Sequence, residues 1–267
     1  MDLFKTHLAP IADESWEEIN ETAEKVLKTT LSARKVLHVE GPFGLNKASV
    51  PQGSLTVLND EKLGEVSGGL YDVDRLVESR ISFELARWEL DNILRGKKDP
   101  DLDVLEDAAE KLALYEEDAI YNGNKKAGIK GLIELAPHKL SLSENANATL
   151  QAIAEGLLLL QDAYVEKPYV LVVGDEVFKA VNQVYDGKLL CTAIEDLIGG
   201  RVIHSKVLEG ALLLPENHPD LELTIGQDYT IGYTSHTSEV VRLFLMNAFT
   251  FRVFDEKLIV YYKFYKK

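Results

Sequence analysis

The side chains that most often carry catalysis or bind metals are few and scattered in this chain of 267 residues. No histidine follows a glutamate at the Glu-x-x-His spacing of di-iron sites, and neither H-E-x-x-H nor H-x-H occurs. The six histidines are His7, His38, His138, His204, His218 and His236. Glycine-rich phosphate loops and the G-x-S-x-G elbow are missing too. The sequence therefore predicts no catalytic residue and no metal site.

Thiol and carboxylate side chains give no stronger prediction. Cys191 is the only cysteine, so it has no partner for an intrachain disulfide and no second thiolate for zinc. We expect it to be a small buried hydrophobic side chain. Carboxylates crowd one segment, at Glu106, Asp107, Glu110, Glu116, Glu117 and Asp118. Their spacing predicts the solvent-facing side of an amphipathic helix rather than an acid–base pair in a dry pocket.

The charge balance and the apolar runs bear on partners and location. Lysine and arginine number 29 against 44 acidic residues, a net charge of −15, and the longest basic clusters are Lys-Lys pairs. We therefore expect no nucleic-acid partner. The best apolar runs, at 156–160 and 243–246, are too short for a membrane span. The N-terminus lacks the features of a signal peptide, so we expect a cytoplasmic protein without a membrane partner.

A helix near the N-terminus is the first element that could position side chains for binding. We expect Asp13 to cap it, because a carboxylate accepts the orphan backbone N–H groups. Apolar residues then recur at spacings of three and four, at Trp16, Ile19, Ala23, Val26, Leu27 and Leu31. They share one face, which either packs on its own domain or borders a groove for a partner segment.

The remaining elements mix helices and strands without regular alternation, which predicts the α+β class. Expected helices end the segment 81–95 and cover 102–122, where Gly123 closes the helix, then 148–163, 175–184 and 189–198. Expected strands cover 34–40, the start of 81–95, 169–173, 201–204, 211–214, 221–225, 229–233, 240–254 and 258–264. The strand at 169–173 is continuously apolar, as a covered central strand would be.

Residues 46–79 differ from the rest because they contain little apolar mass. They also carry one proline and four glycines, which are Pro51, Gly53, Gly64, Gly68 and Gly69. We interpret this segment as an extended two-stranded arm. An isolated hairpin is marginal in water, so such an arm is stable only when something covers it. This points to an assembly.

Several blocks, in order along the chain, resemble the encapsulin shell proteins, also called the linocin-type family. They are residues 8–10 with Trp16 and Ile19, 34–42, 88–96, 117–123, 128–132, 226–233 and 241–244. The resemblance implies the fold of tailed-phage major capsid proteins (HK97 type), with a peripheral domain, an axial domain and an extended loop. It also implies a self-assembling icosahedral shell around cargo enzymes, with no catalysis by the chain and no required cofactor.

The family's domain plan carries over onto this sequence by segment. It assigns 1–45 to the N-terminal helix and the first part of the peripheral domain, 46–79 to the extended loop, 80–135 to the peripheral domain with its spine helix, 136–224 to the axial domain and 225–267 to the return into the peripheral domain. The expected partners are further copies of the chain, sixty or a multiple in an icosahedron, and a cargo protein. Family cargoes are ferritin-like iron proteins, peroxidases and related redox proteins.

Family cargo carries a short C-terminal targeting peptide that docks on the inner face of the shell. The resemblance assigns its binding to Ile19, Ala23, Val26, Leu27, Arg34, Val36, His38, Ile231 and Tyr233. An apolar extended peptide needs an apolar groove with a few polar anchors, which fits these residue types. His38 stands where close relatives are expected to have an acidic residue, so we expect pH-sensitive affinity for the peptide.

Two further sites follow from the resemblance. The turn Tyr185, Asp186, Gly187 and Lys188 resembles the loop that lines the fivefold pore, and it is otherwise an ordinary surface turn. Some family members bind flavin beside a tryptophan and an arginine, which match Trp88 and Arg80. Trp88 is otherwise a core or interface anchor.

Three alternatives stay open at this point. A prophage major capsid protein of the same fold would package DNA. A flavin-dependent enzyme would use Trp88 and Arg80. A secreted antibacterial protein fits the older family label but would need a signal peptide.

Overall fold

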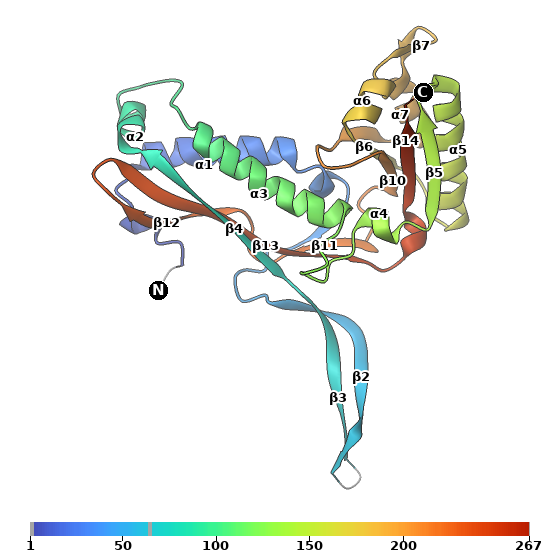
Figure 1. Cartoon of the computed structure of the whole chain (residues 1–267), viewed down its shortest axis with the longest axis horizontal. Coiled ribbons are helices and arrows are strands. Elements are labelled where there is room, and N and C mark those ends of the chain that lie inside the picture. Colours follow the sequence, from blue (N-terminus) through green and yellow to red (C-terminus); the bar gives the residue numbers. More distant parts are fainter. Residues whose placement is uncertain (1–2, 64–65, 267) are drawn as a thin grey trace.

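The computed structural model describes residues 3–63 and 66–266 of the chain. These residues form two lobes, and a long hairpin projects away from the first lobe (Figure 1). Each lobe contains one five-stranded sheet with both parallel and antiparallel pairs. Helices and strands are not arranged as alternating βαβ units, which agrees with the predicted α+β class.

The sheet of the first lobe is organised around one 14-residue strand, β13. Its strands in spatial order are β1 (His38–Glu40), β11 (Leu221–Ile225), β13 (Val240–Val253) and β12 (Thr230–His236), with β4 (Val77–Ala86) beside β13. β11 and β12 pair with successive parts of β13, whereas β4 pairs with it over ten residues, from Val77 to Ala86. As a result β12 stands at the edge of the sheet.

Helices cover one face of this sheet and close the core of the first lobe. α1 (Asp13–Thr30) and α3 (Asp103–Tyr121) run across it together, and α2 (Arg87–Leu94) lies near their far end (Figure 1). Ile19 from α1 and Leu105 from α3 are both fully buried in this core. The amphipathic periodicity of the two helices explains the arrangement, because each buries one stripe against the sheet.

The second lobe has its own sheet and its own helices. Its strands in spatial order are β5 (His138–Ser143), β14 (Val260–Tyr265), β10 (Ala211–Pro215), β6 (Tyr169–Val173) and β9 (Arg201–His204). Its helices are α4 (Leu132–Leu135), α5 (Ala146–Asp162), α6 (Asp175–Val181) and α7 (Leu190–Ile198). Every residue of β6 is buried, so the prediction of a covered central strand is confirmed.

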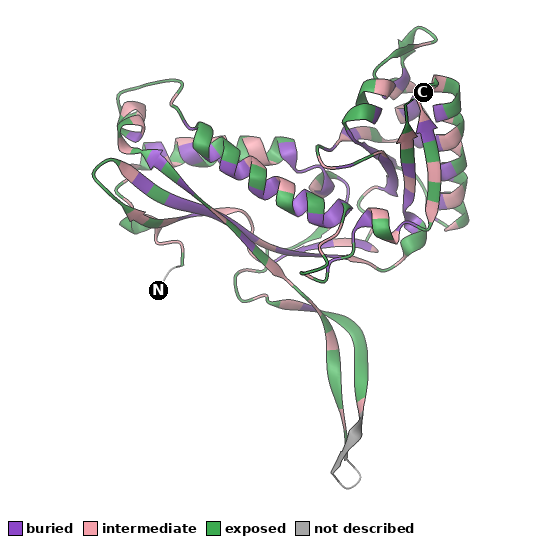
Figure 2. Cartoon of the chain, in the orientation of Figure 1, coloured by how far each residue is buried: buried purple, intermediate pink, exposed green. Residues whose placement is uncertain are grey.

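The hairpin consists of β2 (Ser49–Leu63) and β3 (Val66–Arg75), paired antiparallel with two bulges in the register. The prediction of a two-stranded arm is confirmed. Figure 2 shows most of the hairpin exposed, in contrast to the lobes. Its exposed large apolar side chains are Leu55, Val57, Leu70, Tyr71 and Val73. Tyr71 is 82% exposed, so this apolar surface has no cover within one chain.

Short elements complete the chain and correct two predictions. They are η1 (Thr6–Leu8), η2 (Ala33–Lys35), η3 (Glu256–Leu258), β7 (Val184–Tyr185) and β8 (Lys188–Leu189). The predicted strand at 34–40 is wrong over its first half, because polar contacts to α3 hold residues 32–34 in a turn. Asp13 is the first residue of α1 rather than its cap, where its charge favours the positive end of the helix dipole.

The prediction of solvent-facing carboxylates on α3 is wrong for Glu116 and Glu117. Both are buried, with 0% and 1% of their surface exposed. Helical periodicity treats every glutamate as a surface residue, and it does not detect polar partners elsewhere in the sequence. Cys191 also differs from its prediction, because it is only partly buried on α7.

The last strand corrects the predicted course of the C-terminal segment. Residues 225–267 were expected to stay in the peripheral domain, but β14 lies in the second sheet, between β5 and β10. The alternating apolar side chains of β14 bury Val260 and Tyr262 in the second lobe. β11, by contrast, already belongs to the first sheet. The chain therefore crosses between the lobes once more than expected.

Candidate functional site

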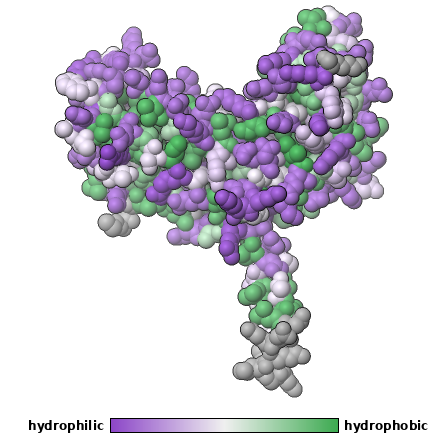
Figure 3. All heavy atoms as spheres, in the orientation of Figure 1, coloured by the Kyte–Doolittle hydropathy of each residue, from purple (hydrophilic) through white to green (hydrophobic). Residues whose placement is uncertain are grey.

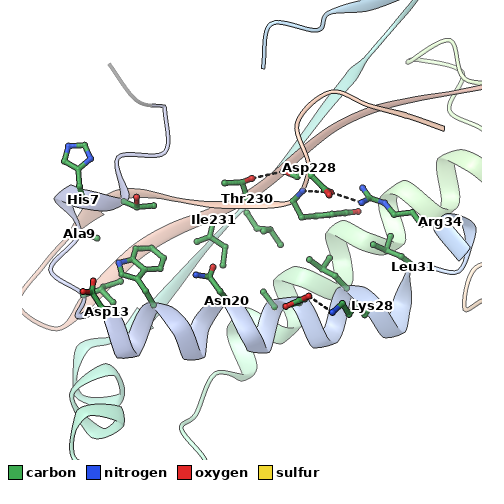
Figure 4. Close-up of a pocket in the computed structure, with 18 of the residues that line it drawn as sticks. His7, Ala9, Asp13, Asn20, Lys28, Leu31, Arg34, Asp228, Thr230 and Ile231 are labelled. Carbon is green, nitrogen blue, oxygen red and sulfur yellow. Dashed lines mark hydrogen bonds and ion pairs between the residues drawn. The ribbon is translucent and has the colours of Figure 1, made fainter. Parts of the chain in front are cut away.

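A groove of about 990 Å³ runs between α1, the N-terminal segment and the β12 edge of the first sheet (Figure 4). Its walls are lined by Thr6, His7, Ala9, Ile11, Asp13, Trp16, Asn20, Ala23, Glu24, Leu27, Lys28, Leu31, Arg34, Lys35, Asp228, Tyr229, Thr230, Ile231 and Leu245. Apolar and polar residues are mixed along the α1 wall, where Asn20 and the Glu24–Lys28 ion pair lie among Trp16, Ala23, Leu27 and Leu31. Such a lining suits a ligand that is largely apolar and extended.

The helix α1 presents two neighbouring faces, and only one of them borders the groove. Ile19 points into the core and is fully buried. Trp16, Asn20, Ala23 and Leu27 line the groove, at positions that recur every three to four residues. Ala23 lies on the boundary, since it is buried and also lines the groove. The groove face therefore lies next to the core face, rotated around the helix axis by about one residue position.

The N-terminal segment forms the wall opposite α1 at one end of the groove. The Tyr233 N–H of β12 donates a hydrogen bond to the Phe4 carbonyl at 2.7 Å. The Phe4 ring stacks on Phe244 of β13, with ring centres 6.4 Å apart. These contacts fix the short η1 turn, which brings His7 and Ala9 to the groove (Figure 4).

Arg34 closes the other end of the groove and is held by two carboxylates. Its Nε donates to Glu116 Oε1 at 2.7 Å and its Nη2 to Glu116 Oε2 at 2.8 Å. Its Nη1 donates to Asp228 Oδ1 at 2.7 Å, and its guanidinium lies 4.7 Å from the centre of the Tyr229 ring. Burial lowers the pKa of Arg34, but the bonds and charges of Glu116 and Asp228 outweigh it and raise the pKa. Arg34 therefore stays charged and is a fixed structural cation.

Glu116 can be buried because its oxygens accept hydrogen bonds from several donors. Besides Arg34, the Asn247 amide donates to Oε2 at 2.7 Å and the Tyr229 hydroxyl donates to the same oxygen at 3.1 Å. A buried ion needs such complete pairing, since an unpaired charge is expensive in a dry interior. The network joins α3, β13 and the loop before β12, which positions one end of the groove.

Glu117 forms a second buried contact that anchors the turn after α1. The Ser32 hydroxyl donates to Oε2, and the Ala33 N–H donates to Oε1 at 2.8 Å. Ser32 also shares a hydrogen bond of 2.8 Å with the Tyr121 hydroxyl. Burial raises the pKa of Glu117 to about 7, although the bonds from Ser32 and Ala33 lower it. The turn thus depends on a carboxyl group that titrates near neutral pH.

The predicted binding residues are distributed over three places. Ala23, Leu27, Arg34 and Ile231 line the groove. Ile19 and Val36 are buried in the two cores, and Val26 packs against the core of the first lobe. His38 lies away from the groove on β1, where its ring nitrogens bond Asn217 at 3.1 Å and Glu40 at 3.0 Å. Tyr233 also packs against the core of the first lobe, and its hydroxyl shares a hydrogen bond of 2.6 Å with His236 Nδ1.

The sequence analysis missed the N-terminal wall and the loop before β12. Thr6, His7, Ala9 and Ile11 lie before the periodic run and belong to no helix longer than three residues. Asp228 and Tyr229 come from the far end of the chain. Trp16 and Leu31 were noted only as part of the apolar face. The spacing of Trp16, Asn20, Ala23 and Leu27 is a signal that could have identified the groove face.

The predicted pore turn forms a small hairpin between β7 and β8. Asp186 and Gly187 have positive φ values of 47° and 77°, which a two-residue hairpin turn requires and which glycine adopts readily. The Tyr185 hydroxyl donates to Asn147 at 2.6 Å, which ties the hairpin to α5. The hairpin stands at the tip of the second lobe (Figure 1).

Arg80 and Trp88 do not form a flavin cradle within one chain. Arg80 lies on β4, over the Phe244 ring and beside Glu78. Trp88 lies on α2, is 70% exposed and stacks under Arg95. The strand residues between them separate the two by about 20 Å at roughly 3.3 Å per residue. The pair therefore does not fit the group, and no chemistry is derived through flavin. Within the described ranges, no cluster of three potential metal ligands occurs either.

The two-lobed fold with its hairpin matches solved shell proteins. A virus-like particle from Pyrococcus furiosus aligns with a TM-score of 0.65 at 16% identity, covering 92% of this chain and 98% of that one. The capsid of Myoviridae phage XM1 aligns with a TM-score of 0.56 at 11% identity, covering 88% and 91%. These likenesses define the class of the fold, which is that of tailed-phage major capsid proteins. The predicted fold is confirmed.

Sequence comparisons place the chain more narrowly. A family model described as an encapsulating protein for peroxidase matches residues 1–250. A type 1 encapsulin shell protein of Rhodospirillum rubrum is 34% identical over 253 residues, 92% of this chain and 90% of that protein. The corresponding protein of Rhodococcus erythropolis is 32% identical over 255 residues, 95% and 96% of the two chains. The chain belongs to the encapsulin shell protein family.

None of the helices in the described part of the chain is both long enough and apolar enough to cross a membrane.

Proposed function

We propose that many copies of this chain assemble into a closed icosahedral shell, of sixty copies or a multiple, that encloses a cargo protein. The exposed apolar hairpin supports this most directly, because a surface that one chain leaves uncovered can be buried by a neighbouring copy. An assembly that closes on itself needs heterologous contacts, and a projecting arm provides them. The role is structural, and we propose no catalytic step for the chain.

The groove along α1 is the proposed docking site for the C-terminal targeting peptide of the cargo. Its apolar side chains, among them Trp16, Ala23 and Leu27, suit apolar side chains of an extended peptide. Lys35 at one end and Asp13 at the other have no ion-pair partner among the described residues, so both are open to polar anchors on the peptide. Redox or iron-storage proteins, such as a peroxidase or a ferritin-like protein, are the proposed cargo.

The substitution Leu27→Asp tests the docking site. It places a charge at an apolar position of the groove wall, and we expect at least a tenfold loss of co-purifying cargo, the equivalent of about 1.4 kcal/mol. Lys25→Asp is the matched control, because Lys25 is exposed on α1 and does not line the groove. Both variants should still form shells. Equal cargo in both variants would overturn the docking site but not the shell.

The contents of purified particles distinguish the proposed shell from a prophage capsid. The net charge of −15 gives no advantage to packaging DNA. We expect particles from the native source to contain cargo protein and no protected nucleic acid, as measured by absorbance ratio and nuclease digestion. Packaged DNA would favour the capsid alternative instead.

The hairpin turn of Tyr185, Asp186, Gly187 and Lys188 is the proposed lining of the fivefold pore, through which small substrates would reach the cargo. Its position at the tip of the second lobe supports this role.

Because the proposed shell encloses redox enzymes and the chain carries no disulfide pair, we propose a cytoplasmic location.

A further inference from the structure

Arg252 joins the first sheet to the root of the hairpin. It lies near the end of β13, with 13% of its side chain exposed, and its Nη1 donates a hydrogen bond to the Pro51 carbonyl of β2 at 2.8 Å. Among the described residues, no other hydrogen bond joins β2 to a strand besides β3. The two residues are 201 positions apart in the sequence, so only the fold brings this contact about.

The Arg252 guanidinium is held in place by β11. Glu222 lies directly opposite Arg252 in the register of β11 and β13, and its Oε1 accepts from Arg252 Nη2 at 2.6 Å. The Thr224 hydroxyl donates to the same oxygen at 2.7 Å. Burial raises the pKa of Glu222, but the bonds from Thr224 and Arg252 outweigh it and lower the pKa. Glu222 therefore stays charged, and the planar fork of Arg252 points Nη1 in one direction.

The two strands of the hairpin are attached to the first lobe in different ways. β3 continues into β4 after the single residue Leu76, and β4 pairs with β13 over ten residues (Figure 1). β2 follows a loop whose own bond to the end of β11, from the Gly44 N–H to Gly226, lies well before Pro51. The ladder between β2 and β3 is also interrupted directly after Pro51. Arg252 therefore provides a second attachment at the point where the hairpin leaves the lobe.

A small rotation at the root moves the apolar part of the hairpin by a large distance. The segment from Pro51 to Leu58 extends about 23 Å at roughly 3.3 Å per residue. A rotation of about 10° at Pro51 then displaces Leu58 by about 4 Å, which is the whole distance over which apolar side chains remain in contact. Every copy can therefore place its hairpin on the same surface of a neighbour only when the direction of the root is fixed.

We propose that Arg252 is the positioning residue of the hairpin and that its bond to Pro51 sets the direction in which the hairpin leaves the first sheet. The inference rests on the proposed shell, and it adds the residue that decides which surface of a second copy the hairpin reaches. Arginine suits this role because its fork bonds Glu222 and Pro51 at once, whereas a lysine ammonium is a single point of charge. Loss of the fork frees the hairpin without removing its strands.

Distances between two spin labels measure the direction of the hairpin in a single chain. Ser67→Cys on β3 and Lys25→Cys on α1 provide exposed labelling positions on the hairpin and on the lobe. Cys191→Ser removes the native thiol, and Tyr71→Asp is expected to keep the subunits apart. With Arg252 present, we expect one narrow distribution of distances between the labels.

Two substitutions then separate the bond to Pro51 from the ion pair. Arg252→Lys keeps a cation beside Glu222 but loses the fork, and we expect the distance distribution to become at least twice as wide. Glu222→Gln is the matched control, because its amide oxygen still accepts from Arg252 and the bond to Pro51 remains. We expect this variant to keep the narrow distribution.

Each outcome decides for or against the positioning role. Broadening in Arg252→Lys alone supports it. A narrow distribution in both variants, or equal broadening in both, would overturn it, since the bond to Pro51 would then make no separate contribution. If Arg252→Lys does not fold, as measured by its urea midpoint, the double variant Arg252→Gln with Glu222→Gln replaces it. This variant leaves no unpaired charge and is expected to show the same broadening.

Electron microscopy of particles provides a second measurement, in chains that carry only Arg252→Lys or only Glu222→Gln. We expect several diameters or open fragments from Arg252→Lys, and one diameter from Glu222→Gln and from the parent chain. One diameter from all three, with the hairpin in the same place, would overturn the positioning role but not the shell. Absence of particles from the parent chain would overturn the proposed shell itself.

Discussion

The α1 groove and the β2–β3 hairpin both expose apolar side chains, but the chain supports them very differently. The groove has walls on several sides, and a buried ion pair between Arg34 and Glu116 fixes one end of it. The hairpin has only its two strands, with Tyr71 and Leu70 mostly exposed. A preformed groove suits a flexible ligand, whereas an unsupported arm needs a second structured surface.

The difference between the groove and the hairpin indicates what kind of partner each surface binds. Figure 3 shows apolar residues on the projecting hairpin as well as among the polar residues of the lobes. Because every copy of the chain carries this hairpin, another copy is always available to cover it. In the groove, Arg34 pairs with Asp228 and Lys28 with Glu24, whereas apolar side chains such as Leu27 line the wall without such partners. Its occupant is expected to be a different molecule.

The largest expected effect is loss of assembly when the hairpin is charged. In Tyr71→Asp a carboxylate would have to enter the contact with the neighbouring copy, which we expect to abolish shells. The matched control is Ser67→Asp, which adds the same charge at an exposed polar position on the same strand. Light scattering of both variants measures particle mass. Intact shells from Tyr71→Asp would contradict a buried hairpin.

Removal of Arg34 should damage the fold rather than the assembly contact. Arg34→Met leaves Glu116 buried without its cation, which we expect to cost about 3–5 kcal/mol of unfolding free energy. The urea midpoint measures this in the Tyr71→Asp background, where subunits stay apart. Adding Glu116→Gln removes the unpaired charge and should recover much of the loss. A small effect of Arg34→Met would mean that the groove does not depend on this ion pair.

Glu117 should make the unfolding free energy of the chain depend on pH. Its folded pKa of about 7 lies above the unfolded value of 4.5, so its stabilising contribution is complete below pH 4.5 and is lost as the pH rises through 7. The corresponding shift amounts to about 3 kcal/mol. Unfolding free energies of the parent and Glu117→Gln, measured from pH 4.5 to 8, should diverge by that order. Parallel curves would exclude this role for the carboxyl group.

The smallest expected effect is that of His38 on cargo capture. The bonds to Glu40 and Asn217 raise the pKa of His38, but the residue lies outside the groove. We therefore expect His38→Gln to retain cargo at pH 6 and pH 8 alike, in contrast to the pH-sensitive binding expected from the sequence. Cargo quantified by gel densitometry checks this, and a clear loss would require that the peptide reach β1.

Local patterns predicted the elements that depend on local sequence. The helix over α3 follows its apolar periodicity, and β6 follows its continuous apolar run. The two-stranded arm follows from glycines and prolines in a segment with little apolar mass. In each case the residues that decide the structure lie within the element itself.

The burial of Glu116 and Glu117 could not be predicted in the same way. Arg34 lies 82 residues before Glu116, and Ser32 lies 85 residues before Glu117. Periodicity carries no information about such distant partners, so both glutamates were assigned to the surface. The prediction for β14 was wrong for a similar reason, because the pairing of β14 with β5 and β10 joins segments that are distant in the sequence.

The groove was located approximately but not residue by residue. The resemblance to the family identified α1 and β12, and four of the nine assigned residues line the groove. Ile19 and Val26 lie on the adjacent core face of α1. Successive residues of a helix are rotated by about 100° around its axis, so a shift of one position moves a side chain from one face to the other. Amphipathicity alone does not separate two apolar faces of one helix.

Cryo-electron microscopy of the purified protein tests the central claim most directly, namely that the exposed hairpin is covered by another copy. We predict closed icosahedral shells in which Leu55, Leu70 and Tyr71 pack against a neighbouring subunit. Monomers or dimers across ordinary buffers, with the hairpin exposed to solvent, would contradict the claim.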